Sequence, residues 1–173
     1  IQGRKVVIFT ERHATAVYLE EGLHQWLPQL FVACTSHKTE TDYELKDFEK
    51  EGLPMIKGFA PESNADLIDT SDTLTPYDVF IATDAYSTGV NLQDASVVIN
   101  YDLAWTPDTI IQRAGRVLRL WKEPRLVSLY VFVGDFQTDE DGRTATHGVV
   151  KRLRTLSSRS EQAQQFSELP VFS

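Results

Sequence analysis

The sequence predicts an α/β domain with a mainly parallel central sheet. Short apolar runs rich in Val and Ile recur along the chain, which is typical of strands buried on both faces. Segments with the apolar spacing of amphipathic helices lie between several of these runs, and alternation of strands with helices favours parallel pairing. With 173 residues the chain is long enough for one compact domain. We therefore expect a single domain over residues 1–173.

The first third of the chain predicts two strands, each followed by a helix. KVVIFT (5–10) is an apolar, β-branched run, and ERHATAVYLEEGLHQWL (11–27) then spaces its apolar residues at helical intervals until Pro28. LFVACT (30–35) repeats the strand pattern. TDYELKDFEKEG (41–52) has a capping residue at its start and a glycine at its end, so we expect a short helix there.

The middle of the chain predicts an irregular segment and then two strands. Residues 52–76 are rich in Pro, Gly, Ser, Asn and Asp, and MIKGF (55–59) is their one strand candidate. YDVFIAT (77–83) and ASVVINYD (95–102) predict strands, and the intervening DAYSTGVNLQD (84–94) is typical of a turn.

The last predicted elements are a helix, a strand and a C-terminal helix. TPDTIIQRAGRVLRL (106–120) predicts a helix with Thr106 as N-cap and Pro107 in the first helical position, where its missing N–H costs nothing. RLVSLYVFV (125–133) predicts a strand, and HGVVKRLRTLSS (147–158) has a modest helical pattern. Because parallel strands end at one edge of a sheet, we expect ligands to bind at the carboxyl ends of these strands.

Composition argues against a membrane protein. No run of about 18 apolar residues exists that could cross a bilayer. Cys34 is the single cysteine and lies in an apolar run, so we expect a small buried hydrophobe in a reducing, cytoplasmic environment. The chain begins with Ile1 and lacks the features of a secretory signal. We interpret it as part of a longer protein.

The charge of the chain is unevenly distributed. Its net charge of −8 argues against a uniformly basic surface that would bind nucleic acid. Acidic residues concentrate in 40–84, however, whereas QRAGRVLR (112–119) and KRLRTLSSR (151–159) are locally basic. A basic face is therefore compatible with the negative total.

The polar stretch 112–119 has the residues expected of a phosphate site. On a helix, Gln112, Arg116 and Arg119 would share one face. Gly115 would lie in the helix interior, where glycine costs about 1 kcal/mol relative to alanine and usually marks a close approach by backbone or ligand. Guanidinium groups bind phosphate oxygens with two hydrogen bonds. A solvated face with ordinary ion pairs is the alternative interpretation.

The rest of the chain supplies no complete nucleotide site. A G-x-x-x-x-G-K-[ST] loop is missing, and so is a strand-linked acidic pair to hold Mg²⁺. Arginines supplied to a phosphate site from outside the phosphate-binding domain are arginine fingers. The histidines are scattered, so we expect no metal site; they are His13, His24, His37 and His147.

The motifs resemble those of superfamily 2 helicases and translocases. KVVIFTE (5–11) is similar to their motif IV, residues 82–92 to motif V, and QRAGRVLR (112–119) to motif VI. The asparagine of GVNL, Asn91, and the stretch VVINYDLAW are more similar to the chromatin-remodelling ATPase branch and its bacterial helicase relatives than to DEAD-box proteins.

The resemblance implies the second lobe of a motor, with a RecA-like three-layer sandwich fold. In that family a first lobe, not contained in this chain, binds ATP and Mg²⁺, and the second lobe closes over the nucleotide. Transferred to this sequence, Arg119 is the arginine finger, Arg116 contacts the γ-phosphate and Gln112 organises the site. Gly89 and Asn91 would bind the nucleotide and couple it to the nucleic-acid groove.

The resemblance also implies a nucleic-acid track. Thr10, Glu11 and Thr83 would lie near the nucleic-acid backbone, and we expect DNA rather than RNA. The first lobe of the same chain is the expected protein partner, and a bacterial or archaeal source is expected. Arg113 varies in the motif, so we expect a surface or lobe-interface arginine there.

These residues favour one of three possible functions over the other two. The preferred one is the C-terminal motor lobe of an ATP-dependent helicase or translocase, inactive when alone. A second is a binding module for nucleic acid or protein that keeps the fold without catalysis. A self-contained phosphate-binding enzyme conflicts with the missing glycine-rich loop.

Overall fold

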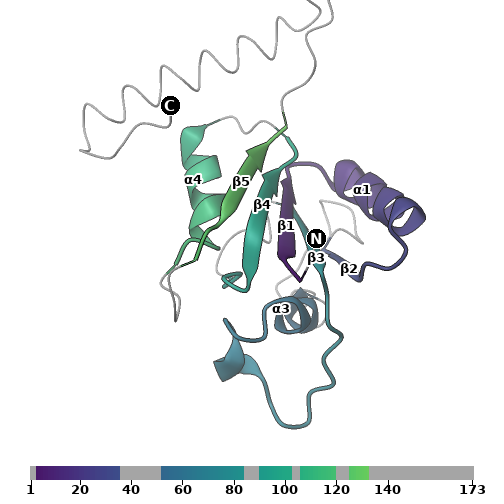
Figure 1. Cartoon of the computed structure of the whole chain (residues 1–173), viewed down its shortest axis with the longest axis vertical. Coiled ribbons are helices and arrows are strands. Elements are labelled where there is room, and N and C mark those ends of the chain that lie inside the picture. The colour runs from purple at the N-terminus through teal and green to yellow at the C-terminus, as the bar shows by residue number, and fades with distance from the viewer. Residues whose placement is uncertain (1–2, 36–51, 84–89, 103–105, 120–124, 133–173) are drawn as a thin grey trace, which may run out of the picture.

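The structure is a computed structural model that describes residues 3–35, 52–83, 90–102, 106–119 and 125–132. Five parallel strands form one sheet in the order β2-β3-β1-β4-β5 (Figure 1). The strands are β1 (Lys5–Thr10), β2 (Val32–Cys34), β3 (Val79–Thr83), β4 (Ala95–Asn100) and β5 (Ser128–Val131). All five overlap strands that the sequence predicts, and the predicted parallel α/β fold is confirmed.

Three α-helices and one short 3-10 helix accompany the sheet in the described residues. They are α1 (His13–Trp26), α3 (Leu53–Phe59), η2 (Ala65–Leu67) and α4 (Pro107–Gly115). Thr106 is the N-cap of α4, and its side chain accepts a hydrogen bond from the backbone N–H of Thr109, as predicted. The predicted helices over 41–52 and 147–158 lie outside the described residues, except for Gly52.

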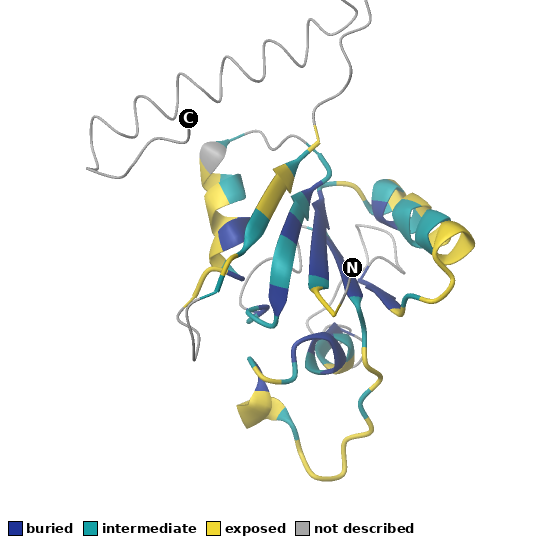
Figure 2. Ribbon diagram, in the orientation of Figure 1, coloured by how far each residue is buried: buried dark blue, intermediate teal, exposed yellow. Residues whose placement is uncertain are grey.

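The sheet is covered on both faces, which makes three layers. Side chains alternate between the faces of a strand, so Val6 and Ile8 of β1 pack with Ala16 of α1, whereas Val7 and Phe9 point to the other face. The first face also buries Cys34, as predicted. Figure 2 shows that the inner strands are mostly buried while the edge strand β5 is largely exposed.

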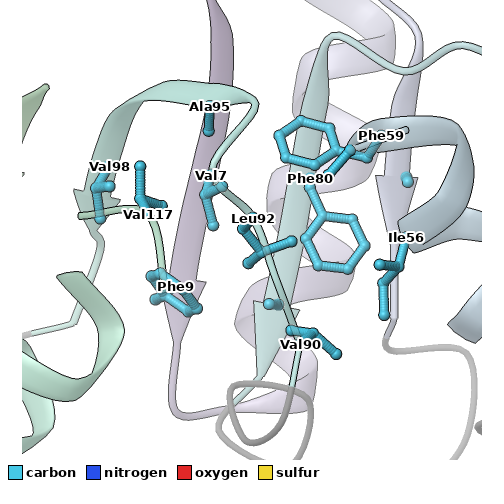
Figure 3. Close-up of a cluster of buried hydrophobic side chains, with 13 residues drawn as sticks. Val7, Phe9, Ile56, Phe59, Phe80, Val90, Leu92, Ala95, Val98 and Val117 are labelled. Atoms are coloured by element: carbon cyan, nitrogen blue, oxygen red, sulfur yellow. The ribbon is translucent and has the colours of Figure 1, made fainter. Parts of the chain in front are cut away.

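The second face of the sheet carries the larger cluster of buried side chains. Figure 3 shows Phe59 of α3 beside Phe80 of β3, and their ring centroids lie 5.3 Å apart. Leu92 and Val117, which come from segments without regular secondary structure, are fully buried in the same cluster. Their burial ties the segment 90–94, which carries Leu92, and the segment after α4 to the core.

The prediction of a strand at MIKGF (55–59) is wrong, because these residues belong to helix α3. Pro54 is in the first turn, where its missing N–H costs nothing. Ile56, Phe59 and Ala60 are buried together, and their spacing of three and four residues describes one helical face. The five-residue run MIKGF concealed this period, since it covers fewer than two turns of helix. The rest of 52–76 is irregular apart from η2, as expected.

No helix in the described part of the chain is long and apolar enough to span a bilayer.

Gly58 allows α3 to pack against the segment before β3. A Cβ atom at this position would lie 2.1 Å from the backbone oxygen of Thr75 and 3.2 Å from the ring of Tyr77. At Gly22 in α1, by contrast, the nearest atom to an added Cβ is in the side chain of Trp26, at 3.4 Å. The two helical glycines therefore differ in the space available for a methyl group.

We predict opposite effects of the same substitution at these two glycines. Gly58→Ala should lower the free energy of unfolding by about 3 kcal/mol, because backbone must move to relieve the overlap. Gly22→Ala should raise it by about 0.5–1 kcal/mol through better helix propensity. Urea denaturation of the 173-residue chain measures both values. Equal effects of the two substitutions would contradict the packing described for α3.

Candidate functional site

The candidate site lies at the edge of the sheet where the parallel strands end. Thr10, the last residue of β1, is the pairing partner of Thr83, the last residue of β3. On the other side of β1, Phe9 pairs with Asn100 at the end of β4. The fold thus brings together Thr10 and Thr83, which are far apart in the sequence.

The turn after β1 is held by Asp102, a residue that the sequence analysis did not single out. The hydroxyl of Thr10 and the backbone N–H of Glu11 both donate to Oδ2 of Asp102, the latter at 2.8 Å. Thr10 is fully buried, so its hydroxyl serves this internal contact, whereas Glu11 is partly exposed. A carboxylate at the carboxyl end of the predicted strand 95–102 was the signal that could have identified Asp102.

Helix α4 ends earlier than predicted, which changes the setting of the arginines. Its last residue is Gly115, and the backbone N–H groups of Arg116 and Val117 bond to carbonyls three residues back, at 3.2 and 3.0 Å. The helix stops because Val117 turns into the core and the carbonyl of Arg116 accepts from the N–H of Leu92 at 3.1 Å. Arg119 therefore follows the helix instead of lying on its face.

Gly115 does not mark a close approach by another part of the described chain. An added Cβ would meet no atom within 4 Å, and the residue is exposed at the end of α4. The prediction of an interior helical glycine is wrong for the same reason as the predicted helix end: Val117 is drawn into the core two residues later.

The arginines after α4 form a cationic group with an exposed side. Gln112 and Arg119 are exposed and Arg116 is partly exposed. Burial, and after it the positive charge of Arg119, lower the pKa of Arg116 from its usual value, although a guanidinium stays charged at neutral pH. The guanidinium of Arg119 donates to the side-chain oxygen of Asn91, so the structure joins two of the predicted site residues directly.

A further arginine, Arg125, forms hydrogen bonds to the backbone next to this group. Its guanidinium donates to the carbonyl of Val117 at 2.7 Å and to that of Ala95 at 2.9 Å. Burial lowers the pKa of Arg125, an effect opposed by the charge of Asp94. The segment that carries Arg116 and Arg119 is thus held from two directions, by Leu92 and by Arg125.

Arg113 is not the surface or lobe-interface residue that the sequence predicted. Its side chain is 1% exposed. One guanidinium nitrogen donates to Oδ1 of Asn100 at 3.3 Å, and the group lies 5.7 Å from the ring centroid of Phe9. The two contacts pin α4 against the ends of β4 and β1. A basic residue in a polar stretch gave no sign of this burial, because the packing partner comes from the first strand.

One predicted site residue cannot be compared with the structure. Gly89 lies outside the described residues, so its proposed role stays a prediction. Within the part of the chain that the structure describes, no group of three or more His, Cys, Asp or Glu residues could hold a metal ion. The described histidines are His13, at the start of α1, and His24, near its end.

Residues 1–120 match the model of the helicase conserved C-terminal domain. The chain is 35% identical over 127 residues to an uncharacterized ATP-dependent helicase, YqhH, of Bacillus subtilis (strain 168), covering 73% of this chain and 18% of that protein. It is 29% identical over 118 residues to DEAD-box ATP-dependent RNA helicase 35B of Oryza sativa subsp. japonica, covering 67% of this chain and 19% of that protein. The chain thus spans about a fifth of the length of these relatives.

The fold is also similar to that of a solved structure. The C-terminal domain of the DEAD-box protein Dbp5 superposes with a TM-score of 0.56 at 20% identity, covering 98% of this chain and 74% of that one. The relatives include bacterial and eukaryotic proteins, and a DEAD-box RNA helicase is among them. They therefore support neither the expected bacterial or archaeal source nor the expected preference for DNA.

We predict that Arg113 and its neighbour Gln112 differ sharply in their effect on stability. Arg113→Ala should lower the free energy of unfolding by about 3 kcal/mol, because it leaves a cavity over Phe9 and removes a donor from buried Asn100. Gln112→Ala, on the exposed side of the same helix, should change it by less than about 0.5 kcal/mol. Urea denaturation of the chain tests both. A surface position for Arg113 would make the two values equal.

Proposed function

Because the chain belongs to the family of helicase conserved C-terminal domains, we propose that it is the C-terminal motor lobe of an ATP-dependent nucleic-acid helicase or translocase. The observation that carries this proposal is the cationic group after α4, in which Arg119 is exposed and oriented by Asn91. In this proposal the chain is part of a longer protein, here called the parent protein, which also includes a first lobe that binds the nucleotide.

The cationic group has the chemistry that a phosphoryl-transfer site requires. Arg116 and Arg119 are permanently charged and present N–H donors that match phosphate oxygens. ATP bound between the lobes would supply a γ-phosphoryl group whose charge becomes spread over its oxygens during transfer. Arg119 would stabilise that charge as an arginine finger, Arg116 would contact the γ-phosphate, and Gln112 would organise the site.

The first lobe has to provide what this chain lacks. The sequence has no G-K-[ST] loop to hold the phosphates, and the described residues contain no acidic cluster for Mg²⁺. We propose that both groups come from the first lobe, so the chain alone would not hydrolyse ATP.

The nucleic acid would pass along the edge where the strands end. Glu11 and Thr83 lie there with their side chains partly exposed. Buried Thr10 would act indirectly, by holding the turn that it forms with Asp102. Asn91, bonded to Arg119, would couple the nucleotide to this edge together with Gly89. Contacts of this kind grip the backbone and read no base sequence.

We predict that Arg119→Ala lowers nucleic-acid-stimulated ATP turnover by the parent protein about 10³-fold. The reason is that the positive charge acts mainly on the transition state, so kcat should fall more than KM rises. Steady-state ATPase assays with single-stranded DNA and with RNA of the same length measure this loss, and also decide which track stimulates more.

The matched control is Arg4→Ala. Arg4 is also an exposed arginine, but it bonds to Ser96 and Ser128 near the start of the strands, at the opposite edge of the sheet. Its substitution removes the same charge and should leave turnover unchanged. If Arg119→Ala hydrolyses ATP as fast as the wild type, the arginines are not catalytic and a non-catalytic binding module becomes the better interpretation.

A further inference from the structure

The segment between α3 and β3 contacts the turn that carries Asn91. Both carboxylate oxygens of Asp94 accept backbone N–H groups from this segment, that of Glu62 at 2.9 Å and that of Ser63 at 2.8 Å. The hydroxyl of Ser63 donates to the same carboxylate and accepts from the N–H of Asp94 at 3.1 Å. Residues 62–64, here called the docking turn, are therefore bonded to the segment 91–94.

Asn64 is the buried member of the docking turn. Its side chain is 2% exposed, and its amide nitrogen donates to the carbonyl of Ala60 at 2.7 Å and to that of Asn91 at 2.9 Å. Both partners are acceptors, so the amide NH₂ must face them. An aspartate would bring an acceptor to the same place, and a serine could satisfy only one of the two carbonyls.

The docking turn also determines which atom of Asn91 faces Arg119. The amide nitrogen of Asn91 donates to the carbonyl of Ser63 at 3.4 Å, which leaves its oxygen directed to the guanidinium of Arg119. If the amide turned over, an NH₂ group would meet a cation that can only donate. The contact with Arg119 therefore depends on the position of the docking turn.

We propose that Asn64 is a positioning residue for ATP hydrolysis. It holds the backbone of Asn91, and Asn91 in turn orients the guanidinium of Arg119. The inference rests on the function proposed for Arg119 and assigns a role to a segment in which no motif residue was expected. An exposed arginine has several free rotamers, so a fixed acceptor lowers the cost of placing its charge at the phosphoryl group.

The test compares ATP turnover by the parent protein with and without Arg119. Asn64→Ala should lower kcat of nucleic-acid-stimulated turnover about tenfold, because a misplacement of about 1 Å can cost up to about 10²-fold. The KM for ATP should stay unchanged, since the lost contact acts on the transition state. In a protein that already carries Arg119→Ala, Asn64→Ala should cause no further loss.

A matched truncation serves as control. Asp66→Ala removes a side chain of the same size two positions away, at an exposed site of η2, and should leave kcat and KM as in the wild type. Thermal unfolding of each variant shows whether it is folded at the assay temperature. Should Asn64→Ala not fold, Ser63→Ala loosens the same docking turn through a single hydroxyl and should lower kcat by a smaller factor, again only when Arg119 is present.

The outcomes separate this inference from the proposed function. If Arg119→Ala lowers turnover but Asn64→Ala, or Ser63→Ala in its place, does not, the positioning role is overturned and the motor function stands. An equal loss from Asn64→Ala in both backgrounds also overturns it, because Asn64 would then act on the fold and not through Arg119. If Arg119→Ala itself has no effect, the proposed function fails, and the inference fails with it.

Discussion

Parallel pairing of β1 with both of its neighbours is the constraint on which the site depends. Because β3 and β4 run in the same direction as β1, the three strands end at one edge of the sheet. The turn after β1, the last residue of β3 and the helix after β4 therefore meet there, although their residues are up to about a hundred positions apart in the sequence. A slip of one residue in the register of β1 would move Thr10 away from Thr83. It would also turn each apolar side chain of β1 to the opposite face of the sheet.

The core also determines how the arginines are presented. Val117 is buried in the cluster that contains Val7 and Phe9. Its burial ends α4 at Gly115 and places Arg119 after the helix. Arg113 on the same helix is buried against Phe9 and cannot serve as a contact to a ligand. One short stretch thus contains a buried arginine that anchors the helix and partly or fully exposed arginines that follow it. In the proposed function, the anchored residue would keep the exposed ones in place, and such preorganisation is what electrostatic stabilisation of a transition state requires.

Much of the fold could be predicted because strand patterns and capping chemistry are local. The apolar runs predicted all five strands, and Thr106 and Pro107 predicted the start of α4. The strand expected at MIKGF and the overlong helix failed for one reason: each depends on which side chains another element buries. Phe59 needs Phe80 as its stacking partner, and the end of α4 needs a core position for Val117. Such partners lie far away in the sequence and leave no trace in local periodicity.

By itself the sequence determined the parallel α/β fold, the family and the residues that could act on a phosphate, because these follow from local patterns and from motif chemistry. The tertiary structure alone decided the contacts of Asp102, Arg113 and Asn64. Each of the three acts through a hydrogen bond to a residue on another element, at Thr10, Asn100 and Asn91 respectively. Whether a polar side chain is exposed or buried depends on what packs over it, and only the folded chain brings that partner into place.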